Sequence, residues 1–214
     1  MVKITKTKAW LLVIGIILSV LIIDQFLKIY IKTHLCLGES IKFANWAYLY
    51  FVENEGMAFG WDVVGTMFLC LFRIIAVIVL CYYIAKLIKD KVNIGFLVCI
   101  AMIVAGAFGN IIDNMFYGLI FTESSHYQIS YLVPWGYGYG SFFSGKVVDM
   151  FYFPIIDCYL PSWLPLWGDN HFVFFSPIFN FADASISCAV IIILLFYRKL
   201  FKDSINKQKV INEE

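Results

Sequence analysis

Residues 9–31 read AWLLVIGIILSVLIIDQFLKIYI, and this stretch decides the class of fold. A helix needs about 20 apolar residues to cross about 30 Å of hydrocarbon, and this stretch meets that requirement. No small-residue cleavage site follows it, so we expect a retained span rather than a cleaved signal peptide. Three further apolar stretches lie at about 65–85, 94–112 and 178–197. The sequence therefore predicts an α-helical integral membrane protein with four transmembrane helices.

The composition of the whole chain agrees with that class. Hydrophobic residues make up 62% of the 214 residues and charged residues only 14%, whereas a soluble domain carries roughly 25% charged residues. This excludes disordered, coiled-coil and nucleic-acid-coating proteins. The net charge of +1 indicates no highly charged partner. We expect a single membrane-embedded domain over residues 1–214, a monomer surrounded by membrane lipid, with no nucleic-acid partner.

Cysteine and histidine give no sign of a metal or cofactor site. The six cysteines include no CxxC pair, and the three histidines match no metal-binding spacing. Four cysteines lie in apolar stretches, where they act as small hydrophobic residues. Cys36 and Cys158 lie outside those stretches, and whether they pair stays open. We expect an activity that uses no metal and no cofactor.

Basic residues predict how the chain crosses the membrane. Three lysines precede the first span, three fill the link between spans two and three, and five Lys or Arg residues follow the fourth. Because positive charge favours the cytoplasmic side, both termini should be cytoplasmic and the loops at about 32–64 and 113–177 should face outward. The second loop is rich in Trp and Tyr, so we expect it to lie on the bilayer. Residues 46–52 (WAYLYFV) predict a strand.

Asp24 is an ionisable residue inside the first apolar stretch. A charge in a span is costly, so it usually faces other helices or a wet cavity, and it often belongs to a functional site. One structural interpretation is a buried ion pair with Arg73, which we expect at similar depth in the second span. Lys28, one helical turn away, is another partner. We favour a scaffold role for Asp24 over a chemical one.

The end of the third span combines small and polar residues. Ala101, Ala105 and Gly109 are spaced by four, which predicts the close approach of another helix. Asn110 and Asp113 are three apart and should lie on one side of the helix. They form either a polar helix end or a patch that faces a cavity.

Asp149 and Asp183 both lie near the predicted outer rim of the membrane. Taken singly, Asp149 is typical of a turn and Asp183 of a helix N-terminus, where a carboxylate stabilises the helix. Together they can share a water molecule. Like charges held close do not both ionise readily, so one carboxyl is expected to keep its proton. The pair predicts metal-free acid–base hydrolysis, and no histidine in the four spans is available to activate a serine or cysteine.

Five motifs follow one another along the chain in a specific order. They are Asp24-Gln25, Asn54-Glu55-Gly56-Met57-Ala58-Phe59-Gly60, Gly109-Asn110-Ile111-Ile112-Asp113, Val147-Val148-Asp149 and Phe179-Asn180-Phe181-Ala182-Asp183. This set resembles the lipoprotein signal peptidase family (type II signal peptidase), which comprises bacterial membrane aspartyl proteases. The resemblance runs from the first span to the fourth.

The resemblance implies an endopeptidase of the bacterial inner membrane with its active site at the outer face. Its substrate would be a diacylglyceryl-modified prolipoprotein, cut on the amino side of the lipidated cysteine. The family fold has four transmembrane helices and a small extracytoplasmic β-cradle, here with an extended second outer loop. Asp149 and Asp183 match the catalytic positions. Substrate-binding or supporting positions are matched by Asn54, Gly56, Asn110, Asp113, Asn114, Asn180 and Asp24.

One position departs from the family pattern, which usually has Arg where this chain has Asn114. A cationic contact to substrate is then missing, or Lys146 or Lys42 supplies it. Two other functional classes stay open. A small proton-coupled transporter would spread essential acids through the membrane depth, whereas a non-catalytic assembly factor would use Asp149 and Asp183 only as caps.

Overall fold

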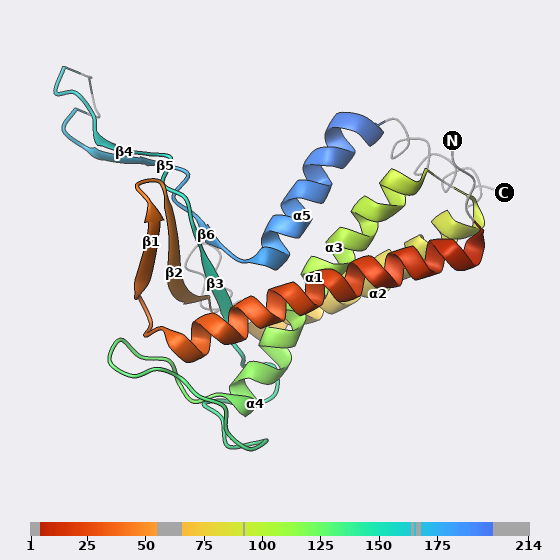
Figure 1. The fold of residues 1–214 in the computed structure, drawn as a ribbon, viewed down its shortest axis with the longest axis horizontal. Helices are drawn as coiled ribbons and strands as arrows, with labels where there is room; N and C mark the ends of the chain where they lie inside the picture. The colour runs from red at the N-terminus through yellow and green to blue at the C-terminus, as the bar shows by residue number, and fades with distance from the viewer. Residues whose placement is uncertain (1–4, 55–65, 92, 164, 166–167, 199–214) are drawn as a thin grey trace. The chain divides into compact units, whose positions relative to one another are not determined.

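The computed structural model describes residues 5–54, 66–91, 93–163, 165 and 168–198. Figure 1 shows the chain coloured from its N-terminus in red to its C-terminus in blue. The chain divides into two compact units. The first unit contains residues 1–24, 71–111 and 182–214, and the second contains residues 25–70 and 112–181. The prediction of one domain over 1–214 stays a prediction.

Apolar stretches of the sequence form the long helices. They are α1 (Lys6–His34), α2 (Thr66–Lys89), α3 (Ile94–Ile112) and α5 (Phe181–Ile192). A π-helical turn (Asp113–Tyr117) and α4 (Gly118–Ile120) continue α3, and a second π-helical turn (Ile193–Tyr197) continues α5. Within the described residues, three helices are long and apolar enough to cross a membrane, and the apolar helix Phe181–Tyr197 is shorter. Helices suit lipid because they satisfy their backbone polar groups internally.

The four apolar stretches predicted from the sequence are helical, while the prediction that all four cross the membrane stays a prediction. Two of the predicted bounds need correction. The helical stretch that begins at Ile94 passes residue 112 and continues to Ile120, so the second predicted loop begins as a helix. The fourth helix begins at Phe181 rather than at residue 178. The reason is that Ile178 and Phe179 pair with a distant strand, which a local hydropathy pattern does not reveal.

In the first unit, small residues on α3 let neighbouring backbone and side chains approach closely. A methyl group on Gly106 would lie 2.4 Å from the Ala182 carbonyl oxygen, and one on Gly109 would lie 2.7 Å from the Asp24 carboxylate. Ala101 and Ala105 are fully buried. The predicted small-residue stripe is therefore a contact surface, as small residues in membrane helices commonly are.

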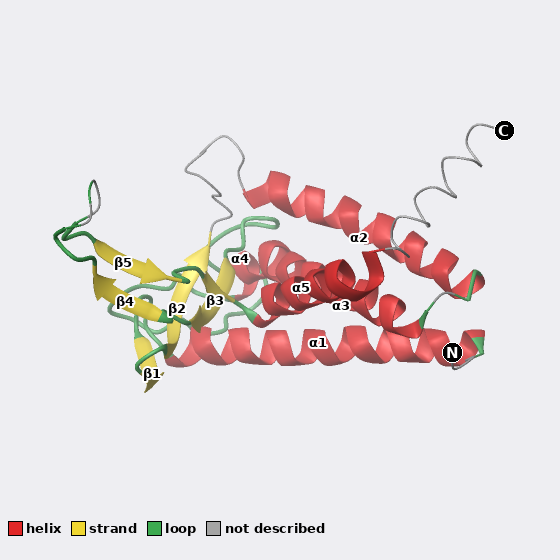
Figure 2. Ribbon diagram, turned by 90° about the horizontal axis from the view of Figure 1, so that it is seen from above, coloured by secondary structure: helices red, strands yellow, loops and turns green. Residues whose placement is uncertain are grey.

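The second unit contains a four-stranded antiparallel sheet with the order β1-β2-β3-β6. Figure 2 shows its strands β1, β2 and β3 in yellow. Its strands are β1 (Ser40–Ala44), β2 (Ala47–Asn54), β3 (Val147–Tyr152) and β6 (Ile178–Phe179). The strand predicted at 46–52 is β2, so that prediction is confirmed. A second sheet consists of β4 (Ile156–Tyr159) and β5 (His171–Phe174).

An apolar cluster joins the sheet of the second unit to the end of α1. Ile31 from α1 and Leu35, directly after it, pack with Phe51 from β2 and with Val148 and Met150 from β3. Two aromatic rings complete this cluster: Tyr117 from the π-helical turn and Phe121, directly after α4. This core fixes β3, the strand that carries Asp149.

Candidate active site

Asp149 lies in the middle of β3 and is almost completely buried, with 4% of its surface exposed. The Asn180 amide donates a hydrogen bond to one Asp149 carboxylate oxygen at 2.7 Å. Antiparallel pairing of β3 with β6 places Phe179 opposite Phe151, so the residue after β6 comes to lie beside Asp149. The alternative that Asp149 is a turn residue was wrong, because Asp149 lies in β3 and pairs with Val52 of β2.

Asp183 lies in the first turn of α5, in the first unit, and is half-buried. The Asn110 amide, near the end of α3, donates a hydrogen bond to one Asp183 carboxylate oxygen at 2.8 Å. Asn110 itself is 2% exposed, so this bond lies largely away from solvent. Each of the two candidate carboxylates thus accepts a hydrogen bond from a buried asparagine.

Asp24 also lies in the first unit and is fully buried. Its carboxylate accepts a hydrogen bond from the backbone N–H of Ala182 at 2.9 Å. The first N–H groups of a helix have no partner within the helix, so a carboxylate at that place caps it. This contact supports the scaffold role for Asp24. The Asp24–Arg73 ion pair stays a prediction.

Asp113 is the centre of a buried network in the second unit. Lys28 forms an ion pair with it at 2.8 Å, and both side chains are fully buried. The Gln25 amide donates to Asp113 at 2.9 Å, and the Val148 backbone N–H donates to it at 3.3 Å. The Tyr117 hydroxyl in turn donates to Gln25 at 3.1 Å. Asp113 therefore links α1 to the residue that precedes Asp149.

Asn114 points into the protein, with 1% of its surface exposed. Its amide donates to the Gly145 carbonyl at 2.8 Å, and the Gly145 N–H donates back to the Asn114 carbonyl at 2.9 Å. A methyl group on Gly145 would lie 1.9 Å from the Asp113 carbonyl oxygen, so only glycine allows this approach. Asn114 thus holds the chain two residues before β3 begins.

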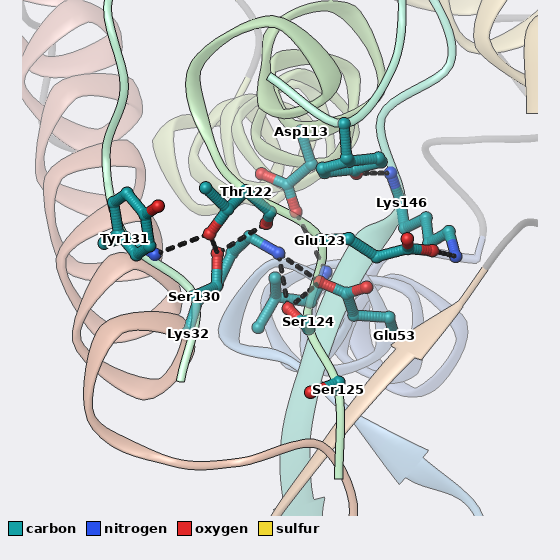
Figure 3. A network of polar contacts seen from close by, with 12 residues as sticks. Lys32, Glu53, Asp113, Thr122, Glu123, Ser124, Ser125, Ser130, Tyr131 and Lys146 are labelled. Atoms are coloured by element: carbon teal, nitrogen blue, oxygen red, sulfur yellow. Dashed lines mark hydrogen bonds and ion pairs between the residues drawn. The ribbon is translucent and has the colours of Figure 1, made fainter. Parts of the chain in front are cut away.

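Sequence reasoning missed a second buried charge cluster, formed by Lys32, Glu53 and Ser124 (Figure 3). The Lys32 ammonium, fully buried, donates to Glu53 and also to the Ser124 hydroxyl, at 2.7 Å for the serine. Ser124 donates to Glu53 at 2.8 Å. The sequence did contain a signal for this cluster. Lys28 and Lys32 lie four residues apart in an apolar helix, and buried lysines there require acidic partners.

The cluster of Lys32, Glu53 and Ser124 fixes the end of β2, because Glu53 is the second-last residue of that strand. Asn54, the last residue of β2, is exposed. Gly56, a predicted site residue, lies outside the described residues. Lys146 has its ammonium 3.9 Å from a Glu123 carboxylate oxygen and is about a quarter exposed. Its role as the replacement for the family arginine stays a prediction.

The predicted site residues therefore fall into two groups. Asp24, Asn110 and Asp183 are linked within the first unit, and the residues linked or neighbouring within the second are Asn54, Asp113, Asn114, Asp149 and Asn180. That Asp149 and Asp183 meet over one water stays a prediction. No group of three His, Cys, Asp or Glu side chains among the described residues is arranged to hold a metal ion. Cys36 and Cys158 are free thiols.

Comparison with known proteins relates most of the chain to one family. The family model described as signal peptidase (SPase) II matches residues 16–199 of this chain. Lipoprotein signal peptidase of Porphyromonas gingivalis (strain W83) is 46% identical over 202 residues, which cover 94% of this chain and 89% of that protein. The protein of the same name from Amoebophilus asiaticus (strain 5a2) is 34% identical over 200 residues, covering 90% and 80%. A solved bacterial membrane enzyme, determined by the in meso method at 2.3 Å resolution, has a TM-score of 0.58 at 27% identity and covers 91% of this chain and 90% of its own.

Proposed function

The chain belongs to the signal peptidase II family, and on that premise we propose that Asp149 and Asp183 are the catalytic pair of this protease. The protein removes signal peptides from prolipoproteins, and it is a multi-pass protein of the bacterial inner membrane. The family assignment does not support the transporter or the assembly factor. The proposal concerns which residues carry out the reaction, and where.

One observation carries the assignment of the pair. Asp149 and Asp183 each accept an amide N–H from a buried asparagine, Asn180 at 2.7 Å and Asn110 at 2.8 Å. A donor on one carboxylate oxygen restricts rotation of the carboxylate and directs its second oxygen. Two carboxylates held in this way are suited to position a shared water.

The reaction follows from the chemistry of paired carboxylic acids. The ionised carboxylate accepts a proton from water as the water oxygen attacks the scissile carbonyl carbon. The protonated carboxyl donates its proton to the carbonyl oxygen and, as the C–N bond breaks, a proton passes to the leaving amine. No metal is needed, because the dyad itself supplies both acid and base. Cleavage falls on the amino side of the diacylglyceryl-modified cysteine.

The proposal puts this chemistry at the outer membrane surface. It takes as spans the three helices that are long and apolar enough, α1, α2 and the α3–α4 stretch, together with the shorter α5. Both termini then lie on the cytoplasmic side, because the basic residues concentrate there. The sheet of the second unit is then the extracytoplasmic β-cradle. A lipidated cysteine in the outer leaflet and water from outside both reach this level. The proposal also takes the enzyme to act as a monomer.

The test is processing of a lipoprotein in a host that lacks its own enzyme of this type. Asp149→Asn or Asp183→Asn should insert normally and accumulate uncut, lipid-modified precursor. Asp169→Asn is the matched control, since Asp169 is exposed and lies outside both hydrogen-bonded groups. Normal processing by either of the first two variants would refute the pair.

Lys146→Ala should raise KM if Lys146 supplies the missing cationic contact, and an unchanged KM would remove that role.

A further inference from the structure

The hairpin of β4 and β5 is an amphipathic element with no described cover on its apolar face. Ile156 pairs with Phe174, and Cys158 pairs with Phe172. Directly opposed residues in an antiparallel pair lie on the same face, as do residues two apart in one strand. One face is therefore made of Ile156, Cys158, Phe172 and Phe174, and all four side chains are exposed.

The opposite face of the hairpin is more polar, because it carries Asp157, His171 and Tyr159 beside Val173. Asp157 pairs with Val173, and Tyr159 pairs with His171. The His171 ring nitrogen lies 2.6 Å from an Asp157 carboxylate oxygen, and both side chains are about half exposed. This division into an apolar and a polar face is typical of an element that lies on a surface rather than one that is surrounded by water.

Such a hairpin requires a cover for its apolar face. Two isolated strands are only marginally stable in water, and exposing two phenylalanine rings and an isoleucine on one face adds to that cost. β4 and β5 pair only with each other within the described sheets. None of the four side chains of this face is buried by the described part of the chain, so we look for a cover in the surroundings of the protein.

The composition of the hairpin favours lipid as that cover. Residues 155–175 contain no Lys or Arg and two aspartates, so attraction to anionic headgroups cannot hold the segment in place. Trp163, in the segment between β4 and β5, is 78% exposed, and tryptophan prefers the headgroup level of a bilayer. An apolar face beside such a residue suits the boundary between headgroups and acyl chains.

The connection of the hairpin within the second unit places it near that boundary. Only residues 153–155 separate β3 from β4. β3 packs through Val148 and Met150 on Ile31 and Leu35, at the end of α1. If α1 ends at the outer membrane surface, as the proposed function requires, the hairpin starts close to the same surface.

We propose that the apolar face of the β4–β5 hairpin enters the headgroup region of the outer leaflet and binds zwitterionic lipid. The inference rests on the membrane orientation given under the proposed function. The hairpin thereby anchors the end of the sheet to the bilayer at a point outside the membrane-spanning helices. Asp157 and His171 remain in water on the other face.

The test uses a photoreactive benzoylphenylalanine placed at Phe172 in the full-length protein. The matched control carries the same probe at Val173, the neighbouring residue on the opposite face. Both proteins are reconstituted in phosphatidylcholine vesicles, irradiated and analysed by mass spectrometry. Probes at Phe174 and Asp157 form a second matched pair in case one variant does not fold.

A phosphatidylcholine adduct at Phe172 and Phe174 that exceeds the adduct at Val173 and Asp157 several-fold is the expected result. Equal adducts on both faces, or an adduct with the mass of a second protein chain, would overturn the proposal. An adduct that forms only with anionic phosphatidylglycerol would also overturn it. Repeating the experiment with Asp149→Asn separates the two proposals, because lipid contact does not require catalysis.

Discussion

Replacing Asn180 or Asn110 by Ala removes the amide donor from one carboxylate while leaving both aspartates in place. A hydrogen bond to a charged group contributes about 1.5–3 kcal/mol, and 1.4 kcal/mol corresponds to a factor of ten. Loss of the Asn180–Asp149 bond should therefore lower kcat/KM by roughly 10- to 150-fold. The bonds are 2.7 and 2.8 Å long, so geometry alone gives similar values for the two variants.

Burial separates the two variants. Asp149 is 4% exposed, whereas Asp183 is half-buried, so water can replace the lost donor more readily at Asp183. We therefore expect Asn180→Ala to lower kcat/KM more than Asn110→Ala does.

The assay is cleavage of a diacylglyceryl-modified peptide by purified protein in detergent, with melting temperatures measured alongside. Asn170→Ala serves as the matched control, because Asn170 is exposed in the hairpin loop and its replacement should leave kcat/KM unchanged. An Asn180→Ala protein that melts normally and keeps kcat/KM within about twofold of wild type would show that this bond does not orient a catalytic group. A larger loss for Asn110→Ala than for Asn180→Ala would contradict the burial argument.

Three further predictions concern the supports of β3. Gly145→Ala should lower the melting temperature and the activity, because its methyl group would lie 1.9 Å from a backbone oxygen, whereas Gly15→Ala, with nothing within 4 Å, should do neither. Lys28→Met should destabilise the protein by about 3–5 kcal/mol in chemical unfolding, because it leaves the buried Asp113 carboxylate without its cation, and a change under about 1 kcal/mol would contradict this. Asn114→Arg, which restores the usual family residue, should reduce rather than raise the yield of folded protein, because Asn114 is buried against Gly145; a fully active, stable variant would show that the side chain can turn outward.

Local sequence patterns predicted the helices well, because an apolar stretch in lipid has few alternatives to a helix. They failed where a distant segment decides the structure. Ile178 and Phe179 continue the apolar pattern of α5, but pairing with β3 makes them a strand. Asp149 alone is typical of a turn, but its pairing with Val52 of β2, nearly 100 residues earlier in the sequence, makes it a strand residue.

The sequence predicted only part of the candidate site, again because contacts between distant segments decide the rest. The polar residues stood out because they interrupt apolar sequence, and the family motifs assigned them roles. Which asparagine serves which aspartate depends on contacts 31 and 73 residues apart in sequence, which no spacing rule supplies. The sequence did not predict a role for Glu53 or Ser124, because neither residue is unusual in its local sequence. Only the structure shows that both contact the buried Lys32 ammonium.

The bond between Asp24 and the Ala182 N–H has a consequence for biogenesis. Its two partners are 158 residues apart, so it can form only after synthesis has reached α5. Helix α1 carries the carboxylate, and α5 brings the amide. The nascent protein must therefore begin α5 before α1 reaches its mature set of contacts, and a chain stopped short of Ala182 cannot make this connection.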